Sequence, residues 1–422
     1  MQKVKKILSI LGPGFITGAS DDDPSGIATY AQTGAKFGYS QAWTAPFSFP
    51  FMTAIQEMCG RIGLVTGKGL SGVIKKHYSK PVLYFAVSIL FIANTVNIGA
   101  NLGAMAGAAG LLLNIPFIFW LIGMTVLTLV LEIFVSYKVY AKYLKYLAFS
   151  LFSYVLVVFV VKQNWSQLLI STVVPSFSLS RDYLLNIVAI LGTTISPYLF
   201  FWQGSEEVEE EVEKGKIMGI GRGIPKISKR DISEMRVDTV FGMFFSNLVM
   251  FFIIATVAST LYVSGVNNID TAAQAAEALR PLAGDFAYVL FAAGIIGVGL
   301  LSVPILAGSA SYAISESFGW REGLYRKFTQ AHGFYGAITI ATLVGLLVNF
   351  LEIPPFQMLY YTAILNGIAA PPLLVIILLI SNNKKIMGNR TNSFISNTLG
   401  IIITLVMGAC AIALILNLLG AI

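Results

Sequence analysis

Long apolar runs, each about 20 residues in length, follow one another along most of the chain. A helix of that length is needed to cross a hydrocarbon layer of about 30 Å. The runs lack the polar–apolar alternation of membrane-barrel strands, so their pattern predicts helices. We predict eleven membrane spans, at about residues 10–37, 42–66, 82–112, 115–136, 140–162, 183–212, 235–263, 284–318, 333–352, 355–381 and 393–420.

The positions of the basic residues predict the direction of these spans. With eleven spans, all but four of the 28 lysines and arginines fall on one side of the membrane, the exceptions being Lys36, Lys162, Arg181 and Arg280. Short cytoplasmic loops are enriched in basic residues. We therefore expect a multi-pass plasma-membrane protein with a cytoplasmic N-terminus and an extracellular C-terminus.

Composition supports a membrane protein and excludes several functions. Hydrophobic residues make up 56% of the 422 residues and charged residues only 12%. The net charge of +7 comes from short loops without the interleaved aromatic residues of single-strand nucleic-acid binders, so no nucleic-acid partner is expected. No span contains a nucleophile with a base, which argues against an enzyme. We expect one transmembrane domain over residues 1–422, monomeric in lipid, with Cys59 and Cys410 as free packing residues.

Two of the predicted spans contain helix-breaking polar segments. In the first span, Gly12-Pro13-Gly14 is followed by Ser20-Asp21-Asp22-Asp23-Pro24-Ser25-Gly26. Three carboxylates at membrane depth are costly unless they are paired, and Pro24 disfavours a helical conformation at Asp23. The sixth span carries Gly192-Thr193-Thr194-Ile195-Ser196-Pro197-Tyr198, again small polar residues before a proline. We predict that both helices unwind at these segments.

The two broken spans are five helices apart, which predicts two five-helix repeats. Repeat one covers about 7–163, repeat two about 183–382, and an extra helix about 393–420. Because each repeat has an odd number of spans, the second is inverted relative to the first. Broken helices at matching positions of inverted repeats indicate the central site of a secondary transporter.

At these motifs the chain resembles the natural resistance-associated macrophage protein (NRAMP) family of divalent-metal transporters. The resemblance runs nearly end to end and includes Gly12-Pro13-Gly14, the stretch Arg61 to Gly67 (Arg-Ile-Gly-Leu-Val-Thr-Gly), and Met387-Gly388. It implies an all-α integral membrane protein of the LeuT-type fold, with two inverted five-helix repeats, an eleventh helix, and helices one and six broken. In that family, an Asp-Pro-Gly-Asn motif and an Ala-Thr-Val-Met-Pro-His-Asn motif supply an aspartate, an asparagine, a carbonyl and a methionine sulfur to a transition metal.

This chain keeps part of those motifs and departs from the rest. Asp23 and Pro24 keep the family's Asp-Pro, whereas Gly26 stands where the ligand asparagine is usual. The resemblance implies metal ligands at Asp23, Gly26, Thr193, Ser196 and Asn366, with Asp22, Tyr198 and Asn97 as secondary candidates. Ser196 takes the position of the methionine, so a hydroxyl replaces the thioether.

Loss of the thioether changes the expected cargo. Sulfur ligands favour transition metals, whereas oxygen ligands suit Mg²⁺, which usually retains several waters. The pattern resembles the NRAMP-related magnesium transporter branch. We expect import of a partly hydrated Mg²⁺, with Mn²⁺ as a second cargo, and no resident cofactor. The alternatives are a proton-coupled Mn²⁺/Fe²⁺ transporter and a cation channel.

Proton coupling is not expected, because the usual relay residues are missing. The third span carries Asn94, Asn97 and Asn101, which are polar but uncharged. The only histidines, His77 and His332, lie near predicted cytoplasmic loops and are expected at the surface.

Other charged residues have two interpretations each. Glu57 and Arg61 have the spacing of a local helical ion pair. The glutamates from Glu206 to Glu213 form either an acidic vestibule or a solvated helix end neutralised by the basic loop that follows. Asp21 and Asp22 are expected beside the site or in its vestibule, since three consecutive side chains of a helix cannot point the same way. The alternative is that one of them binds a second ion or pairs with a distant lysine.

Overall fold

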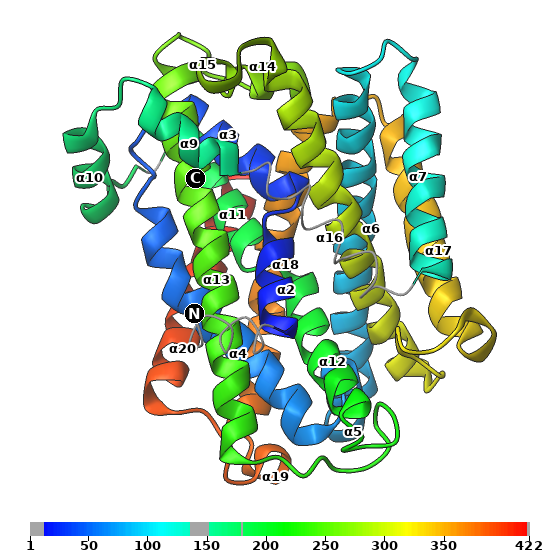
Figure 1. Cartoon of the computed structure of the whole chain (residues 1–422). Coiled ribbons are helices and arrows are strands. Elements are labelled where there is room, and N and C mark those ends of the chain that lie inside the picture. The colour runs from blue at the N-terminus through cyan, green and yellow to red at the C-terminus, as the bar shows by residue number, and fades with distance from the viewer. Residues whose placement is uncertain (1–11, 136–151, 179, 420–422) are drawn as a thin grey trace, which may run out of the picture.

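The computed structural model describes residues 12–135, 152–178 and 180–419 of the chain, and it is all-helical over these residues. The long helices form one bundle, with short helices at both of its ends (Figure 1). The α-helices are α2 (Pro13–Asp21), α3 (Pro24–Phe37), α4 (Thr44–Thr66), α5 (Leu70–His77), α6 (Lys80–Gly110), α7 (Phe117–Phe134), α9 (Phe152–Val160), α10 (Trp165–Val173), α11 (Arg181–Thr194), α12 (Pro197–Glu213), α13 (Lys229–Val257), α14 (Ala272–Glu277), α15 (Arg280–Ala283), α16 (Ala287–Phe318), α17 (His332–Leu347), α18 (Pro355–Asn382), α19 (Lys384–Met387) and α20 (Phe394–Leu418).

Within the described residues, eight helical stretches are long and apolar enough to cross a membrane. They correspond to the predicted third, fourth, sixth, seventh, eighth, ninth, tenth and eleventh spans. The first predicted span is divided into α2 and α3, and the second is α4, which carries Glu57 and Arg61. Most of the predicted fifth span, 140–162, lies outside the described residues, which resume at α9.

Some predicted boundaries were wrong for identifiable local reasons. The seventh span was predicted from 235, but α13 begins at Lys229, because Ser228 and Asp231 form a reciprocal capping box at its N-terminus. The eighth was predicted from 284, where a short 3-10 turn precedes the α-helix. Hydropathy does not reveal a polar first turn, so the seventh helix is longer than its apolar run.

Both predicted breaks are present. The first span stops at Asp21 and resumes at Pro24, and the sixth stops at Thr194 and resumes at Pro197. At each break, a proline opens the second half-helix and the residue before it is extended. The interruption therefore follows directly from the sequence.

Close helix crossings hold the broken helices in the centre of the bundle (Figure 1). The first half-helix of the first span, α2, packs against α13, and the first half-helix of the sixth span, α11, packs against α18. A β-carbon at Gly18 would lie 2.3 Å from the backbone of Gly242, and one at Gly192 would lie 2.0 Å from the carbonyl oxygen of Ala363. These crossings require glycine, because no side chain fits between the two backbones.

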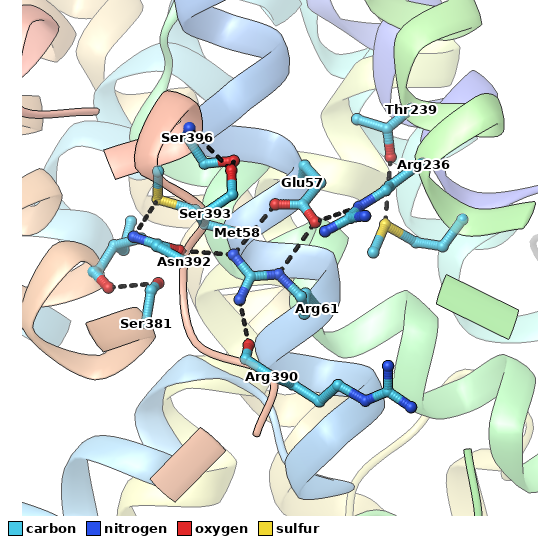
Figure 2. Close-up of polar contacts among 12 residues, drawn as sticks. Glu57, Met58, Arg61, Arg236, Thr239, Ser381, Arg390, Asn392, Ser393 and Ser396 are labelled. Atoms are coloured by element: carbon cyan, nitrogen blue, oxygen red, sulfur yellow. Dashed lines mark hydrogen bonds and ion pairs between the residues drawn. The ribbon is translucent and has the colours of Figure 1, made fainter. Parts of the chain in front are cut away.

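Arg61 joins α4 to the segment before α20 (Figure 2). Its Nε donates to Glu57 Oε1 at 3.0 Å, which confirms the predicted ion pair. The buried guanidinium also donates to the carbonyl of Arg390 and, at 2.6 Å, to Asn392 Oδ1. Glu57 receives a second cation, Arg236 of α13, at 2.8 Å. The Arg61 network thus ties α4 and α13 to the segment before α20.

Candidate functional site

The break in the first span leaves a short non-helical stretch buried in the bundle. Asp22 and Asp23 lie between the two half-helices, and Asp23 is the N-cap of α3. Its Oδ1 accepts from the Gly26 backbone N–H at 2.8 Å and from Ser25 Oγ at 2.6 Å. Capping satisfies a backbone donor that the break would otherwise leave unpaired.

The other oxygen of the Asp23 carboxylate faces α6. Oδ2 accepts from Asn101 Nδ2 at 3.1 Å and from Asn97 Nδ2 at 3.4 Å. Asn97 is linked in turn to Thr362 of α18, whose hydroxyl donates to Asn97 Oδ1 at 3.2 Å. Asp23 is therefore held entirely by neutral donors, including the predicted candidate Asn97.

Asp21 and Asp22 point away from α6 toward α13. The Ser246 hydroxyl lies 2.5 Å from Asp21 Oδ2 and 3.4 Å from Asp22 Oδ1. Asp21 Oδ1 is buried without a hydrogen-bond partner in the described part of the chain. Asp21 and Asp22 thus share Ser246, and only Asp23 bonds to the amides of α6.

The break in the sixth span lies against the first. The Tyr198 hydroxyl donates to the backbone oxygen of Ser20 at 2.9 Å, which joins α12 to α2. Ser196 donates to the carbonyls of Gly192 and Thr193, at 2.8 and 2.7 Å. A β-carbon at Gly26 would lie 3.3 Å from Thr193 Oγ1 and 3.1 Å from the carbonyl oxygen of Asp21. Glycine at position 26 therefore keeps a gap between oxygen atoms of the two breaks.

Asn366 lies buried in α18, and its amide nitrogen has no hydrogen-bond partner among the described residues. It is one helical turn after Thr362, which contacts Asn97. The structure thus connects Asn97 and Gly26 to Asp23 by hydrogen bonds and brings Thr193 beside Gly26. Ser196 and Tyr198 bond only to backbone oxygens near the breaks, and within the described ranges no hydrogen bond joins Asn366 to the other candidates.

The charge of this site is not balanced by a basic residue. Asp21, Asp22 and Asp23 are all buried, and none forms an ion pair within the described ranges. In the described part of the chain, no group of three or more His, Cys, Asp and Glu side chains has a metal-binding arrangement. A buried carboxylate without a positive partner is unstable in charged form, so this centre requires a cation or protons.

Several residues of the site were missed by the sequence interpretation. Ser246 is a lone hydroxyl beside Asn247 in an otherwise apolar run, and only its position opposite Asp21 gives it a role. Asn101 was noted as polar but was not a predicted site residue, although it is the nearer of the two amides to Asp23. Outside this site, Glu132 of α7 is also buried, and neither of its carboxyl oxygens has a hydrogen-bond partner among the described residues. Its charge within an apolar span was the signal for it.

An acidic cavity of about 290 Å³ lies between α2, α12 and α13. Its carboxylates are Glu207, Glu210, Glu211, Asp231, Glu234 and Asp238, with Lys214 and Arg230 as the basic residues. Glu207 accepts from Gln203 Nε2 at 2.8 Å, and Gln203 Oε1 accepts from Thr17 of α2 at 2.6 Å. A continuous path of hydrogen bonds thus leads from this cavity to α2, the first half of the first broken helix.

The cavity decides between the two interpretations of the glutamate run only in part. Glu206, Glu207, Glu209 and Glu211 are buried, so the end of α12 is not simply solvated. Lys214 and Lys216 nevertheless pair with Glu210 and Glu211, each at 3.0 Å. The run combines an acidic cavity with local neutralisation by the following loop.

The histidines and cysteines lie as predicted. His77 and His332 are exposed, at the end of α5 and the start of α17. Partial burial, together with Lys76 and Lys68, lowers the pKa of His77. Cys59 and Cys410 are both free thiols.

Comparison with known proteins identifies the architecture. The structure is similar to that of a manganese transporter of Eremococcus coleocola bound to an aromatic bis-isothiourea compound, with a TM-score of 0.74 and 17% identity over 96% of this chain and 86% of that one. A mutant of that transporter has a TM-score of 0.73 and 16% identity, over 99% of this chain and 88% of that one. Mhp1, a nucleobase-cation-symport-1 family transporter, has a TM-score of 0.55 and 13% identity, over 97% of this chain and 92% of its own. These likenesses show the predicted LeuT-type fold.

The family follows from the sequence. The family model described as natural resistance-associated macrophage protein-like matches residues 14–417, nearly the whole chain. Its match begins within α2 and ends within α20, so it includes both broken helices. The chain belongs to the natural resistance-associated macrophage protein family of membrane metal transporters.

Proposed function

We propose that this protein imports Mg²⁺ as a partly hydrated ion, with Mn²⁺ as a second cargo, through the junction of its two broken helices. The observation that carries the proposal is the buried, unpaired acidic segment Asp21 to Asp23 at that junction. Its negative charge attracts a cation and would repel the carboxylate of an amino acid. In this proposal the protein is a monomeric plasma-membrane transporter with its N-terminus in the cytoplasm and its C-terminus outside.

The donor chemistry favours a hard cation. Asp23, Thr193, Ser196 and Asn366 offer side-chain oxygen, and Gly26 offers only backbone. None of these candidate ligands has sulfur or imidazole, the groups that favour transition metals. Mg²⁺ is usually bound by one or two carboxylates and keeps several waters, and the missing side chain of Gly26 leaves space for such water.

Binding requires a rearrangement at Asp23. Its oxygens are occupied by Ser25, Gly26, Asn97 and Asn101. At 3.1 and 3.4 Å, the two α6 amides hold Oδ2 more loosely than Ser25 and Gly26 hold Oδ1. We propose that a cation displaces the amides from Oδ2, while Oδ1 continues to cap α3. The amide oxygen of Asn101, which has no hydrogen-bond partner among the described residues, then accepts from a water of the ion.

The inner path runs along α2 and α12. Thr17, Gln203 and Glu207 form an unbroken hydrogen-bonded chain that ends in the acidic cavity. We propose that this chain is the closed inner gate and that the cavity receives the released ion. Separation of α2 from α12 breaks the Thr17–Gln203 bond and opens the route.

Transport is proposed to be driven by membrane potential without proton coupling. The α6 residues beside Asp23 are asparagines, which do not exchange protons near neutral pH. Two observations favour the second candidate, a proton-coupled Mn²⁺/Fe²⁺ transporter: the unpaired carboxyl of Glu132 and the similarity of fold to a manganese transporter. A cation channel is the third candidate.

Uptake into proteoliposomes separates these candidates. The vesicles contain a metal-sensitive dye and a pH-sensitive dye, and Mg²⁺, Mn²⁺ and Cd²⁺ are added singly under an inside-negative potential. We expect saturable Mg²⁺ uptake, weaker Mn²⁺ uptake and no Cd²⁺ uptake, with constant internal pH. Cd²⁺ uptake with internal acidification would support the second candidate, and flux that does not saturate would support a channel. Glu132→Gln serves as a control, because it should change nothing if protons are not coupled.

A further inference from the structure

A second cavity, of about 440 Å³, lies beside α5 and shares no lining residue with the acidic cavity of the proposed ion path. It is formed by α5 and Lys68 ahead of it, by the end of α16 with the following loop, and by the loop between α12 and α13. Six basic residues line it: Lys68, Lys75, Lys76, Arg222, Arg321 and Arg326. These residues come from three separate parts of the sequence, so their convergence is a property of the fold.

The positive charge of this basic cavity is offset only in part by its neighbours, since Lys68 and Lys75 interact with the Glu316 carboxylate, and Lys75 and Arg326 with that of Glu322. None of the six residues forms an ion pair within 4.0 Å in the described part of the chain. Lys75 and Arg326 donate only to backbone oxygens, those of Glu316 and Glu322, at 3.1 and 3.0 Å. Their charges remain available to a ligand.

The two acidic residues of the cavity cancel little of that charge. The Glu316 carboxylate accepts from the backbone N–H groups of Gly69 and Gly72, at 2.6 and 2.8 Å, and so caps the start of α5. Burial, followed by the nearby carboxylates of Glu316 and Glu209, raises the pKa of Glu322 well above its ordinary value. Lys75 and Arg326 act in the opposite direction on this pKa, and Glu322 Oε2 has no hydrogen-bond partner among the described residues.

Aromatic residues place the rim of this cavity at the level of a membrane interface. Trp320 lines the cavity and stacks on Phe318 with ring centroids 5.2 Å apart. Both rings are exposed, Trp320 at 45% and Phe318 at 59%. Exposed tryptophan at the end of a membrane helix is typical of the headgroup region, and basic pockets at such positions bind anionic headgroups.

We propose that the basic cavity binds a phosphate group, and that the phosphate belongs to the headgroup of an anionic phospholipid. Lysine and arginine form charge-assisted hydrogen bonds to phosphate oxygens, and six of them around one cavity favour an anion. A soluble polyphosphate presents the same chemistry, so the experiment must distinguish the two sources. The proposal does not depend on which cation the protein transports.

Thermal unfolding of the purified protein in detergent, without divalent metal, tests the proposal. The probes are dioctanoyl phosphatidylglycerol, dioctanoyl phosphatidylcholine and inorganic tripolyphosphate. The test variant is Arg222→Gln/Arg321→Gln. Both side chains are exposed and neither forms a hydrogen bond or ion pair within the described ranges, so the fold should be retained. The control is Lys226→Gln/Lys229→Gln, which removes the same charge from exposed positions outside the cavity.

We expect phosphatidylglycerol to raise the Tm of the wild type and of the control, and phosphatidylcholine to leave it unchanged. The test variant should need about ten-fold more phosphatidylglycerol for the same shift, since two charged contacts are lost. A shift with tripolyphosphate at equal concentration would keep the phosphate site but assign it to a soluble ligand. The proposal would be overturned if neither phosphatidylglycerol nor tripolyphosphate shifted the Tm of the wild type. It would also be overturned if phosphatidylglycerol shifted the Tm of the test and control variants equally.

Discussion

Asp23 combines a structural role and a proposed ligand role in one carboxylate. One oxygen caps α3 through Gly26, and the other faces the α6 amides. The two roles have different chemical requirements. A cap needs a side-chain oxygen acceptor, which asparagine also supplies, whereas a divalent cation needs the negative charge.

Replacing Asp23 in two ways separates the two roles. Asp23→Asn should abolish Mg²⁺ uptake and leave the Tm close to that of the wild type. Asp23→Ala should abolish uptake and also lower the unfolding free energy by about 0.5–2 kcal/mol, the usual effect of losing an N-cap. Uptake and thermal unfolding of both variants provide the check. Retained uptake in Asp23→Asn would show that the charge of Asp23 is not needed.

Ser196 tests whether the missing thioether determines selectivity. Its hydroxyl is occupied by the carbonyls of Gly192 and Thr193, so Ser196→Met frees two carbonyls and adds a sulfur. We expect Cd²⁺ uptake to increase about tenfold relative to Mg²⁺, the lower range of effects seen when groups around a metal change. Ser196→Ala is the matched control, since it frees the same carbonyls without sulfur. Equal Cd²⁺ uptake by the two variants would rule out sulfur as the cause.

At the residue level, the sequence predicted those features that depend on local chemistry. Asp23 stands out because a charged residue beside a proline is rare in an apolar span, where its burial is costly unless it binds or pairs. Ser246 and Asn101 could not be assigned, because each acquires its role only from a partner far away in the sequence. Serine and asparagine also occur in membrane helices as ordinary packing residues, so composition did not distinguish them.

At the level of elements, prolines and capping residues explain where the helices begin and end. Pro24 and Pro197 open the two half-helices as predicted. The short helices α10, α14 and α15 were not predicted, because they lack a long apolar run. The contact between α4 and the segment before α20 was likewise absent from the sequence pattern, although the local Glu57–Arg61 pair was predicted.

The Arg61 network offers a test at the level of elements (Figure 2). Arg61→Ala should lower the unfolding free energy by about 3–5 kcal/mol, because it leaves buried acceptors without their cation. Arg236→Ala removes the other partner of Glu57, but that side chain is 50% exposed, so the loss should be about 0–1 kcal/mol. Thermal unfolding in one detergent measures both. A similar Tm for the two variants would contradict the structural role given to Arg61.

At the level of the whole molecule, the distribution of basic residues predicts an orientation. The proposal places the loop between α12 and α13 in the cytoplasm and the segment after α13 outside. Lys226 and Ser264 lie in these two regions and are both exposed.

Cysteine labelling in intact cells tests this orientation. In a background without Cys59 and Cys410, Ser264→Cys should react with a membrane-impermeant thiol reagent, and Lys226→Cys should react only after the cells are permeabilised. The reverse pattern would invert the proposed topology. Labelling of both before permeabilisation would contradict it as well.

The two five-helix repeats were predicted from two proline-terminated breaks that lie five helices apart, whereas the LeuT-type fold was implied by the resemblance to the NRAMP family. The acidic cavity was predicted only as one of two interpretations of the glutamates from Glu206 to Glu213, and the basic cavity was not predicted, since each cavity collects charges from segments separated by many residues. Sequence showed that these loops were charged. Only the three-dimensional arrangement showed which charges share a cavity.

The most direct test of the central proposal is Mg²⁺ uptake by wild type and Asp23→Asn in proteoliposomes under an inside-negative potential. Empty vesicles and Asn382→Ala, a change at an exposed position near the end of α18, serve as controls. We predict saturable Mg²⁺ uptake by the wild type and the control variant, and none by Asp23→Asn. The proposal that the broken helices form a magnesium site would be contradicted if the wild type took up no Mg²⁺, or if Asp23→Asn took up Mg²⁺ as well as the wild type.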